Sequence, residues 1–257
     1  MSIKIFVPID STALSLGAHE VAEVISKEAQ AKKIDIEIIR NSSRGLFWLE
    51  TLVEVETPQG RIGFGPVSPS DVKSLFDADF INGGKHPLAL GFVADIDWLK
   101  KQERLTFARM GITEPTSIDQ YEAHDGFQGL KNALKLKPEA IVETITSSGL
   151  RGRGGAAFPT GIKWKTVLDT KATQKYIVCN ADEGDSGTYS DRMIMEGDPF
   201  VLIEGMIIAG LAVGASQGYI YLRSEYPHAL KTLNEAIYQA TKAGYLGEDI
   251  LKSCQVS

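Results

Sequence analysis

Helical and strand patterns alternate along the C-terminal half of the chain, and this alternation is the strongest constraint on its fold. Strand-forming residues are concentrated at residues 176–179 and 218–223, and helical patterns cover residues 138–147, 198–213 and 227–243. Strands that are separated by helices usually pair in parallel through helical crossovers. This half is therefore predicted to be an α/β domain with two parallel, buried strands.

Two strands are few for such a domain. Both are apolar enough to need cover on both faces, and a stable sheet usually contains more strands. The chain ends at residues 254–257, where another strand could begin. We therefore expect a C-terminally truncated piece of a longer polypeptide, in which residues 138–257 are the first part of a domain.

The first 80 residues have the pattern of a small thioredoxin-like domain. The predicted order is strand, helix, three strands and a helix, at residues 3–7, 16–31, 34–39, 52–56, 61–64 and 71–76. Residues 57–60, Thr-Pro-Gln-Gly, supply turn chemistry for a hairpin, and Ser70 or Asp71 can cap the last helix.

Residues 81–137 are expected to form a helical connector between these two domains. A helix is predicted from Asp95, a plausible N-cap, to Met110, with Gly111 just beyond its end. Four apolar residues would pack this helix on a neighbour: Trp98, Leu99, Leu105 and Phe107.

Composition limits the class of protein. Hydrophobic residues make up 43% and charged residues 23% of the chain, which argues against disorder. The charge of 27 − 33 = −6 and the pI near 5.3 argue against nucleic-acid binding and basic membrane-surface binding. No secretory signal is visible, and the apolar stretch 201–215 is shorter than the roughly 20 residues of a membrane span. We therefore expect a cytoplasmic protein without nucleic-acid or membrane partners.

The residue inventory also excludes several kinds of site. Cys179 and Cys254 cannot by themselves form a disulfide framework, a CxxC pair, or a cysteine-ligated zinc or iron–sulfur site. No HxH or HExxH spacing joins His19, His86, His124 and His228. The spacing GxSxG occurs at residues 214–218, but there it leads from a predicted helix into a predicted strand, the reverse of the strand-to-helix turn of a serine hydrolase elbow. We therefore expect no metal site and no nucleophilic triad.

The strongest local signal is a glycine-rich loop at residues 149–164, GLRGRGGAAFPTGIKW. Its backbone amides can approach a phosphate closely at Gly152, Gly154 and Gly155. Positive charge is added by Arg151, Arg153 and Lys163. Phe158 offers a flat apolar face to an aromatic ring, so the set suits a nucleotide. The alternative is a structural loop with solvent-facing arginines.

Two familiar phosphate-binding loops do not account for this segment. Gly152-x-Gly154-x-x-Ala157 formally matches the dinucleotide fingerprint, but that fingerprint follows a strand and here a helix precedes it. The P-loop pattern fails because Lys163 lies two residues beyond Gly161.

An acidic loop at residues 180–192, NADEGDSGTYSDR, is the second signal. Asp182, Glu183 and Asp185 lie within four residues, directly after a predicted strand. Carboxylates at the end of a parallel strand often face a ligand crevice, where they could accept hydrogen bonds from ribose hydroxyls or a flavin ring N–H. Metal binding and a solvated charge run remain alternatives, although no EF-hand spacing is present.

These two loops, followed by residues 198–205, resemble the FMN- and NADH-binding flavoprotein subunit of respiratory complex I and its soluble relatives. The resemblance covers residues 117–257. The first 80 residues resemble the thioredoxin-like ferredoxin domain that some relatives carry in front, where four cysteines hold a [2Fe-2S] cluster. Residues 1–150 contain no cysteine, so no such cluster is expected here.

Within this family, the pattern looks most like the beta subunits of soluble NAD-dependent, molybdenum-containing formate dehydrogenases. The segments that carry this likeness are residues 40–50, 105–115 and 180–193. A diaphorase subunit of an NAD-reducing hydrogenase, or a complex I subunit, is the alternative. Residues 1–80 could also be a non-catalytic module that docks a partner subunit.

The resemblance implies roles for the glycine-rich loop. Gly152 and Gly154 would line the nucleotide site, with Gly155 beside them. Phe158 would stack on the adenine of NADH, and Lys163 would contact the flavin phosphate or the dinucleotide. Thr166 stands where some relatives carry a second aromatic residue.

It also implies roles for the acidic loop. Asn180, Asp182 and Glu183 would hold FMN. Asp185 stands near the nicotinamide end, where many relatives have Glu, and it is one methylene shorter.

The implied reaction is hydride transfer between nicotinamide and FMN, which the cofactor carries without a catalytic side chain. A molybdenum-containing subunit would oxidise formate, and electrons would reach FMN through iron–sulfur clusters, including that of a small [2Fe-2S] ferredoxin-like subunit. A [4Fe-4S] cluster and the rest of the FMN pocket are expected beyond position 257.

Overall fold

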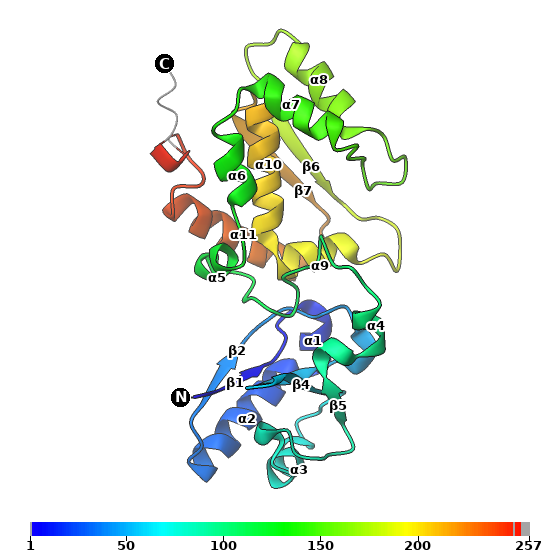
Figure 1. The fold of residues 1–257 in the computed structure, drawn as a ribbon, viewed down its shortest axis with the longest axis vertical. Helices are drawn as coiled ribbons and strands as arrows, with labels where there is room; N and C mark the ends of the chain where they lie inside the picture. Colours follow the sequence, from blue (N-terminus) through cyan, green and yellow to red (C-terminus); the bar gives the residue numbers. More distant parts are fainter. Residues whose placement is uncertain (1, 249, 253–257) are drawn as a thin grey trace. The chain divides into compact units, whose positions relative to one another are not determined.

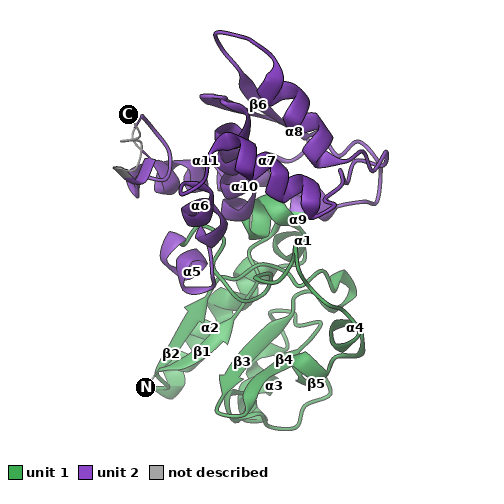
Figure 2. Cartoon of the chain, turned by 45° about the horizontal axis from the view of Figure 1, so that its top comes forward, with its two compact units in different colours: residues 1–117, 193–198 green, residues 118–192, 199–257 purple. Residues whose placement is uncertain are grey.

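The computed structural model describes residues 2–248 and 250–252. The chain divides into two compact units (Figure 2). Unit 1 comprises residues 1–117 and 193–198, and unit 2 comprises residues 118–192 and 199–257. The strand expected at residues 254–257, including Cys254, lies outside the described residues.

Unit 1 is built on a five-stranded sheet with the order β2-β1-β3-β4-β5 (Figure 1). Its strands are β1 (Ile3–Phe6), β2 (Ile36–Ile39), β3 (Val53–Thr57), β4 (Gly60–Phe64) and β5 (Ala89–Phe92). β1 and β2 are parallel, and the other neighbours are antiparallel. This is the predicted thioredoxin-like arrangement, which the structure confirms. β5 was not predicted.

Two helices connect β1 to β2 where the sequence predicted one. α1 (Ser11–Ser15) starts at Asp10, whose carboxylate accepts hydrogen bonds from the amides of Thr12 and Ala13. Gly17, with φ +91°, separates it from α2 (Ala18–Lys32). α2 then buries Val21, Ile25 and Ala29 in the unit 1 core.

The predicted β3–β4 hairpin is confirmed, with Thr57 paired to Gly60. The cap predicted for the next helix, α3 (Val72–Asp77), is wrong in detail. Asp71 does precede α3, but its carboxylate accepts hydrogen bonds from the amide and hydroxyl of Ser68 instead of from helix amides.

The helix predicted for residues 95–110 is wrong. The structure has short turns, η3 (Val93–Asp95) and α4 (Asp97–Lys100), followed by irregular chain. The expected apolar face packs only in part: Leu99 is buried with Leu46 and Val93, whereas Trp98 and Leu105 are 62% and 81% exposed. Arginines hold the rest of the segment, because Arg104 donates to the Arg44 carbonyl at 3.2 Å and Arg109 pairs with buried Asp198 at 2.8 Å.

The interior of unit 1 contains buried carboxylates with identified partners. Glu54 pairs with Arg44 and Arg61. Glu50 accepts a hydrogen bond from the Ser43 hydroxyl at 2.6 Å. Burial, followed by the negative charge of nearby Asp10, raises the pKa of Glu50 to about 7.

Residues 193–198 add further carboxylates to this interior. The Glu196 carboxylate accepts from the amide and hydroxyl of Ser11. Gly197 packs so closely on Ser42 and Met110 that a Cβ would lie 2.5 Å from the Met110 sulfur. A side chain at position 197 would therefore displace this part of unit 1.

Unit 2 is mainly helical around a two-stranded parallel sheet (Figure 1). Its helices before the sheet are α5 (Ile118–Ala123), α6 (Gln128–Ala133), α7 (Pro138–Ser147) and α8 (Thr160–Asp169). The remaining elements are β6 (Tyr176–Ala181), α9 (Ser190–Gly197), α10 (Pro199–Val213), β7 (Gln217–Leu222), α11 (Pro227–Lys242) and the turn η4 (Ile250–Lys252). The last residues of α9 count with unit 1.

The parallel pairing of β6 and β7 confirms the prediction for this half of the chain. Their predicted burial on both faces is wrong. One face packs against α10, while Tyr176, Val178, Tyr219 and Tyr221 on the other face are 51–69% exposed. The described chain places no second layer on that face.

α10 is the central helix of unit 2. Its Glu204 is buried, and its carboxylate accepts hydrogen bonds from the Tyr121 hydroxyl at 2.6 Å and from the amides of Phe127 and Leu130 at 2.9 Å each. The two amide bonds satisfy donors at the start of α6, which otherwise lack intrahelical partners. Among the described residues, no helix is both long enough and apolar enough to cross a membrane.

Candidate functional site

The two loops singled out by the sequence both belong to unit 2. The glycine-rich loop joins α7 to α8, and the acidic loop joins β6 to α9. Figures 1 and 2 both place these loops on the same side of unit 2. The acidic loop leaves the carboxyl end of β6, next to the carboxyl end of β7, which is the edge where parallel sheets present ligand-binding groups.

The glycine-rich loop closes on itself. Arg151 and Pro159 form an isolated antiparallel bridge, and the Gly152 amide donates to the Phe158 carbonyl at 2.9 Å. The Gly152 amide is therefore engaged within the loop, contrary to the expectation that it faces a phosphate. Gly154 and Gly155 remain open, because a Cβ at either position would meet no atom within 4 Å.

The loop is shorter than predicted, because α8 begins at Thr160. Lys163 therefore lies on the first turn of α8, where its cation adds to the positive end of the helix dipole. Phe158 precedes the helix and is 47% exposed. Both side chains are exposed and available for a ligand.

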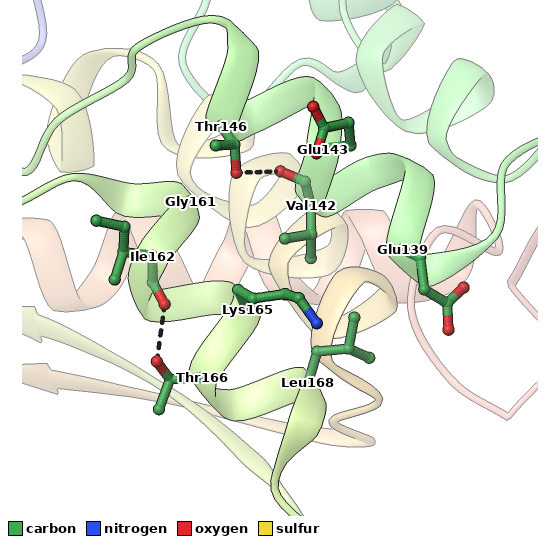
Figure 3. A pocket seen from close by; sticks show the side chains of 9 residues that line it. All are labelled: Glu139, Val142, Glu143, Thr146, Gly161, Ile162, Lys165, Thr166 and Leu168. Carbon is green, nitrogen blue, oxygen red and sulfur yellow. Dashed lines mark hydrogen bonds between the residues drawn. The ribbon is translucent and has the colours of Figure 1, made fainter.

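A cavity of about 460 Å³ lies between α7 and α8 (Figure 3). It is lined by Glu139, Val142, Glu143, Thr146, Gly161, Ile162, Lys165, Thr166 and Leu168. None of the predicted cofactor-binding residues lines the cavity. At Gly161 a Cβ would come within 2.2 Å of the Thr146 hydroxyl, so glycine permits the close approach of the two helices.

In the acidic loop, Asn180 and Asp182 form one exposed pair. The Asn180 side-chain oxygen accepts a hydrogen bond from the Asp182 amide at 3.1 Å, which fixes a tight turn at the end of β6. The side chains of Asn180, Asp182 and Asp185 are exposed. They can offer carboxylate and amide groups to a ligand at this edge.

Glu183 is placed differently. Its carboxylate accepts hydrogen bonds from the amides of Asp191 and Arg192 at 2.7 and 3.0 Å, and from the Tyr226 hydroxyl at 3.0 Å. Burial and this hydrogen bond raise the pKa of Tyr226. Burial, followed by the charge of Glu183, raises the pKa of Asp191.

Arg223 is a residue at this edge that sequence reasoning missed. It follows β7 directly, and its guanidinium donates to the Glu183 carbonyl at 2.6 Å and pairs with Glu225 at 3.2 Å. The signal was available in the sequence, because the carboxyl ends of neighbouring parallel strands meet at one edge. Arg192, whose guanidinium lies 4.6 Å from the Tyr189 ring, adds a second cation.

The edge therefore combines exposed hydrogen-bonding groups with nearby cations. Such a donor and acceptor set fits the polar ribityl chain and ring edge of a flavin mononucleotide. Over the described residues, no group of three His, Cys, Asp or Glu side chains is arranged to hold a metal ion.

The part of the chain that carries both loops is similar to known proteins. Residues 145–256 match the family model described as the Nuo51 FMN-binding domain. The NADP-reducing hydrogenase subunit HndC of Solidesulfovibrio fructosivorans is 51% identical over 154 residues, which are 60% of this chain and 31% of that protein.

Two further relatives match over a similar region. One NADH-quinone oxidoreductase subunit of Aquifex aeolicus is 50% identical over 137 residues, covering 53% of this chain and 32% of that protein. The NAD-reducing hydrogenase HoxS subunit alpha of Cupriavidus necator is 45% identical over 121 residues, covering 47% and 20%. The chain therefore spans a third or less of the length of these relatives.

Proposed function

Because residues 145–256 are related to the FMN-binding domain of complex I-type flavoprotein subunits, we propose that this chain supplies part of an FMN and NAD(H) site in an NAD-linked oxidoreductase. The observation that carries the proposal is the placement of both predicted loops on one side of unit 2, within the matched segment.

Each loop has a separate role in this proposal. Asn180 and Asp182, which are exposed at the carboxyl edge of the sheet, hold the flavin through hydrogen bonds. Gly154 and Gly155 leave space for a phosphate group, and Lys163 supplies a compensating cation. Bound FMN provides the hydride chemistry with nicotinamide, and the protein supplies position and charge.

The ring of Phe158 gives the adenine a stacking surface. Asp185 lies on the same loop as the flavin-holding pair and would stand near the nicotinamide end. Gly152 contributes to the loop's shape, because its amide is bonded to the Phe158 carbonyl.

The proposal is tested with the full polypeptide after reconstitution with FMN. It should catalyse NADH oxidation with ferricyanide as the acceptor. The Asp182→Asn variant should lose flavin and activity together. Failure of the protein to take up FMN, or NADH oxidation by the flavin-free protein, would contradict the proposal.

For the electron donor, we propose formate, oxidised at molybdenum in a separate subunit. The support is the likeness of residues 40–50, 105–115 and 180–193 to formate dehydrogenase beta subunits. The first two segments meet inside unit 1, where Asn41 and Arg44 donate to the Gly111 carbonyl at 2.8 and 3.2 Å.

Hydrogen is the second candidate donor, and it is favoured by the identity to two hydrogenase subunits. Purification of the native complex separates the two. Molybdenum in the complex with formate-dependent NAD⁺ reduction supports formate. Nickel or hydrogen-dependent reduction would favour the hydrogenase alternative.

Iron–sulfur partners belong to the same proposal. A [4Fe-4S] cluster in the full polypeptide and a small [2Fe-2S] ferredoxin-like subunit would connect the donor to FMN. The absence of cysteine from residues 1–150 suits a unit 1 that docks the partner subunit without holding a cluster. Co-purification of that subunit with the full polypeptide, and its loss when residues 1–117 are removed, would support docking.

A further inference from the structure

Glu183 is bonded within the protein through both of its carboxylate oxygens. One oxygen accepts from the Asp191 amide at 2.7 Å and from the Ser190 hydroxyl at 3.3 Å. The other accepts from the Arg192 amide and the Tyr226 hydroxyl, each at 3.0 Å. A carboxylate has about four lone-pair sites, so this one has little capacity left for a ligand.

The amide contacts cap the start of α9. The first four N–H groups of a helix have no intrahelical acceptor. The amides of Asp191 and Arg192 are two of these groups, and a negative carboxylate at this position is favoured by the helix dipole. Glu183, seven residues before the helix begins, thus performs the task that usually falls to the residue directly in front of a helix.

The main chain of Glu183 is held by a separate contact. Arg223, just after β7, donates to its carbonyl at 2.6 Å. The backbone at Glu183 has φ +43°, in the left-handed region that non-glycine residues rarely adopt. Such a conformation persists where the surrounding contacts over-determine it, and here α9, β7 and the start of α11 all contribute one.

Asn180 and Asp182 contrast with this residue. They lie on the same loop, their side chains are exposed, and the bond between them uses the Asp182 amide and not its carboxylate. The carboxylate of Glu183 is therefore bonded within the protein, whereas the side chains of Asn180 and Asp182 are exposed to solvent.

We propose that Glu183 is a positioning residue, which anchors the acidic loop to the start of α9 and the end of β7 so that Asn180 and Asp182 are held ready for the flavin. This proposal rests on the FMN site proposed above and revises the direct flavin contact expected of Glu183.

Amide hydrogen exchange of the full polypeptide without flavin tests the anchor itself. In Glu183→Ala, the Asp191 and Arg192 amides should exchange about fivefold or more faster, because they lose their cap. Glu183→Gln, which retains one acceptor oxygen, should fall between this variant and the wild type. Tyr226→Phe is the matched control, since it removes a bond to the same carboxylate but leaves the helix amides bonded. Unchanged exchange in Glu183→Ala, or equal effects in Tyr226→Phe, would overturn the anchor.

FMN titration separates positioning from direct contact. If Glu183 acts through the loop, the fold-loss of FMN affinity caused by Asp182→Asn should shrink in a Glu183→Gln background, because the two effects are coupled. If instead the fold-losses of the two single variants multiply in the double variant, Glu183 contacts the flavin independently, and the positioning role is overturned. If the wild type binds no FMN while Glu183→Ala still frees the α9 amides, the anchor stands and the FMN site is refuted.

Discussion

Removal of the Phe158 ring offers a sharp test of the nucleotide side of the proposal. Phe158 is 47% exposed, so it is not a core residue whose loss would cost the 3–5 kcal/mol, roughly, of a buried Phe→Ala substitution. Complete burial of such a side chain is worth about 1.5–3 kcal/mol. Half burial therefore predicts a cost of about 1 kcal/mol in the free energy of unfolding for Phe158→Ala.

The expected effect on the dinucleotide is of a different kind. Offset stacking of two rings contributes about 0.5–1.5 kcal/mol beyond area burial, which corresponds to roughly a 2- to 13-fold change in affinity. Phe158→Ala should therefore raise the KM for NAD(H) by that factor. FMN content should remain near that of the wild type, because Asn180 and Asp182 hold the flavin.

The assay measures flavin absorbance, melting temperature and NADH affinity on one preparation of the full polypeptide. Phe158→Leu is the matched control, since it retains apolar volume without an aromatic face and should lose NADH affinity like Phe158→Ala. Unchanged NADH affinity in both variants would remove Phe158 from the site. A large loss of stability together with flavin loss would assign it to the core instead.

Three further predictions concern the frame around the site. Glu204→Ala removes the acceptor of hydrogen bonds from the Tyr121 hydroxyl and two buried amides and should lower the free energy of unfolding by about 3–5 kcal/mol in urea denaturation; a loss below 1 kcal/mol would refute the buried cap. Because burial and Asp10 raise the folded-state pKa of Glu50 to about 7, stability should fall as pH rises from about 4.5 to 7. Glu50→Gln should remove up to about 3 kcal/mol of that fall across the window, and equal pH profiles for both proteins would contradict the shift. Lys175 donates to three carbonyls at the ends of α8 and α10, so Lys175→Met should cost roughly 1–3 kcal/mol, whereas an unchanged melting temperature would show that these bonds contribute nothing net.

The parts of the fold that were predicted from sequence are those that local chemistry specifies. The hairpin at Thr57 to Gly60 follows from its turn residues, and α11 ends as expected before Gly244, which has φ +82°. The parallel pairing of β6 and β7 follows from the helical crossover between them. Each of these signals lies within a few residues of the feature it determines.

The wrong predictions depend on contacts between residues far apart in sequence. The segment at 95–110 has helix-like spacing, but Arg109 pairs with Asp198, 89 residues later, and no local pattern indicates that pairing. The largely apolar runs of β6 and β7 predict cover on both faces, yet cover depends on a second layer that the described chain does not place there.

The candidate site shows the same division. Composition and spacing identified the two loops, and the structure places both on one side of unit 2. The sequence did not distinguish Glu183 from Asp182, although one carboxylate is bonded to α9 and the other is exposed. Adjacent acidic residues look equivalent in a sequence, because their orientations depend on backbone conformation and on partners such as Arg223.

The central claim is that the two loops form part of an FMN site. Its most direct test is a titration of the full polypeptide with FMN, in which binding is measured as quenching of flavin fluorescence. We expect one FMN to bind per polypeptide. Because hydrogen bonds to charged groups contribute about 1.5–3 kcal/mol, we also expect Asp182→Asn to weaken FMN binding roughly 10-fold or more. Absence of flavin binding, or wild-type affinity in Asp182→Asn and Lys163→Gln alike, would contradict this claim.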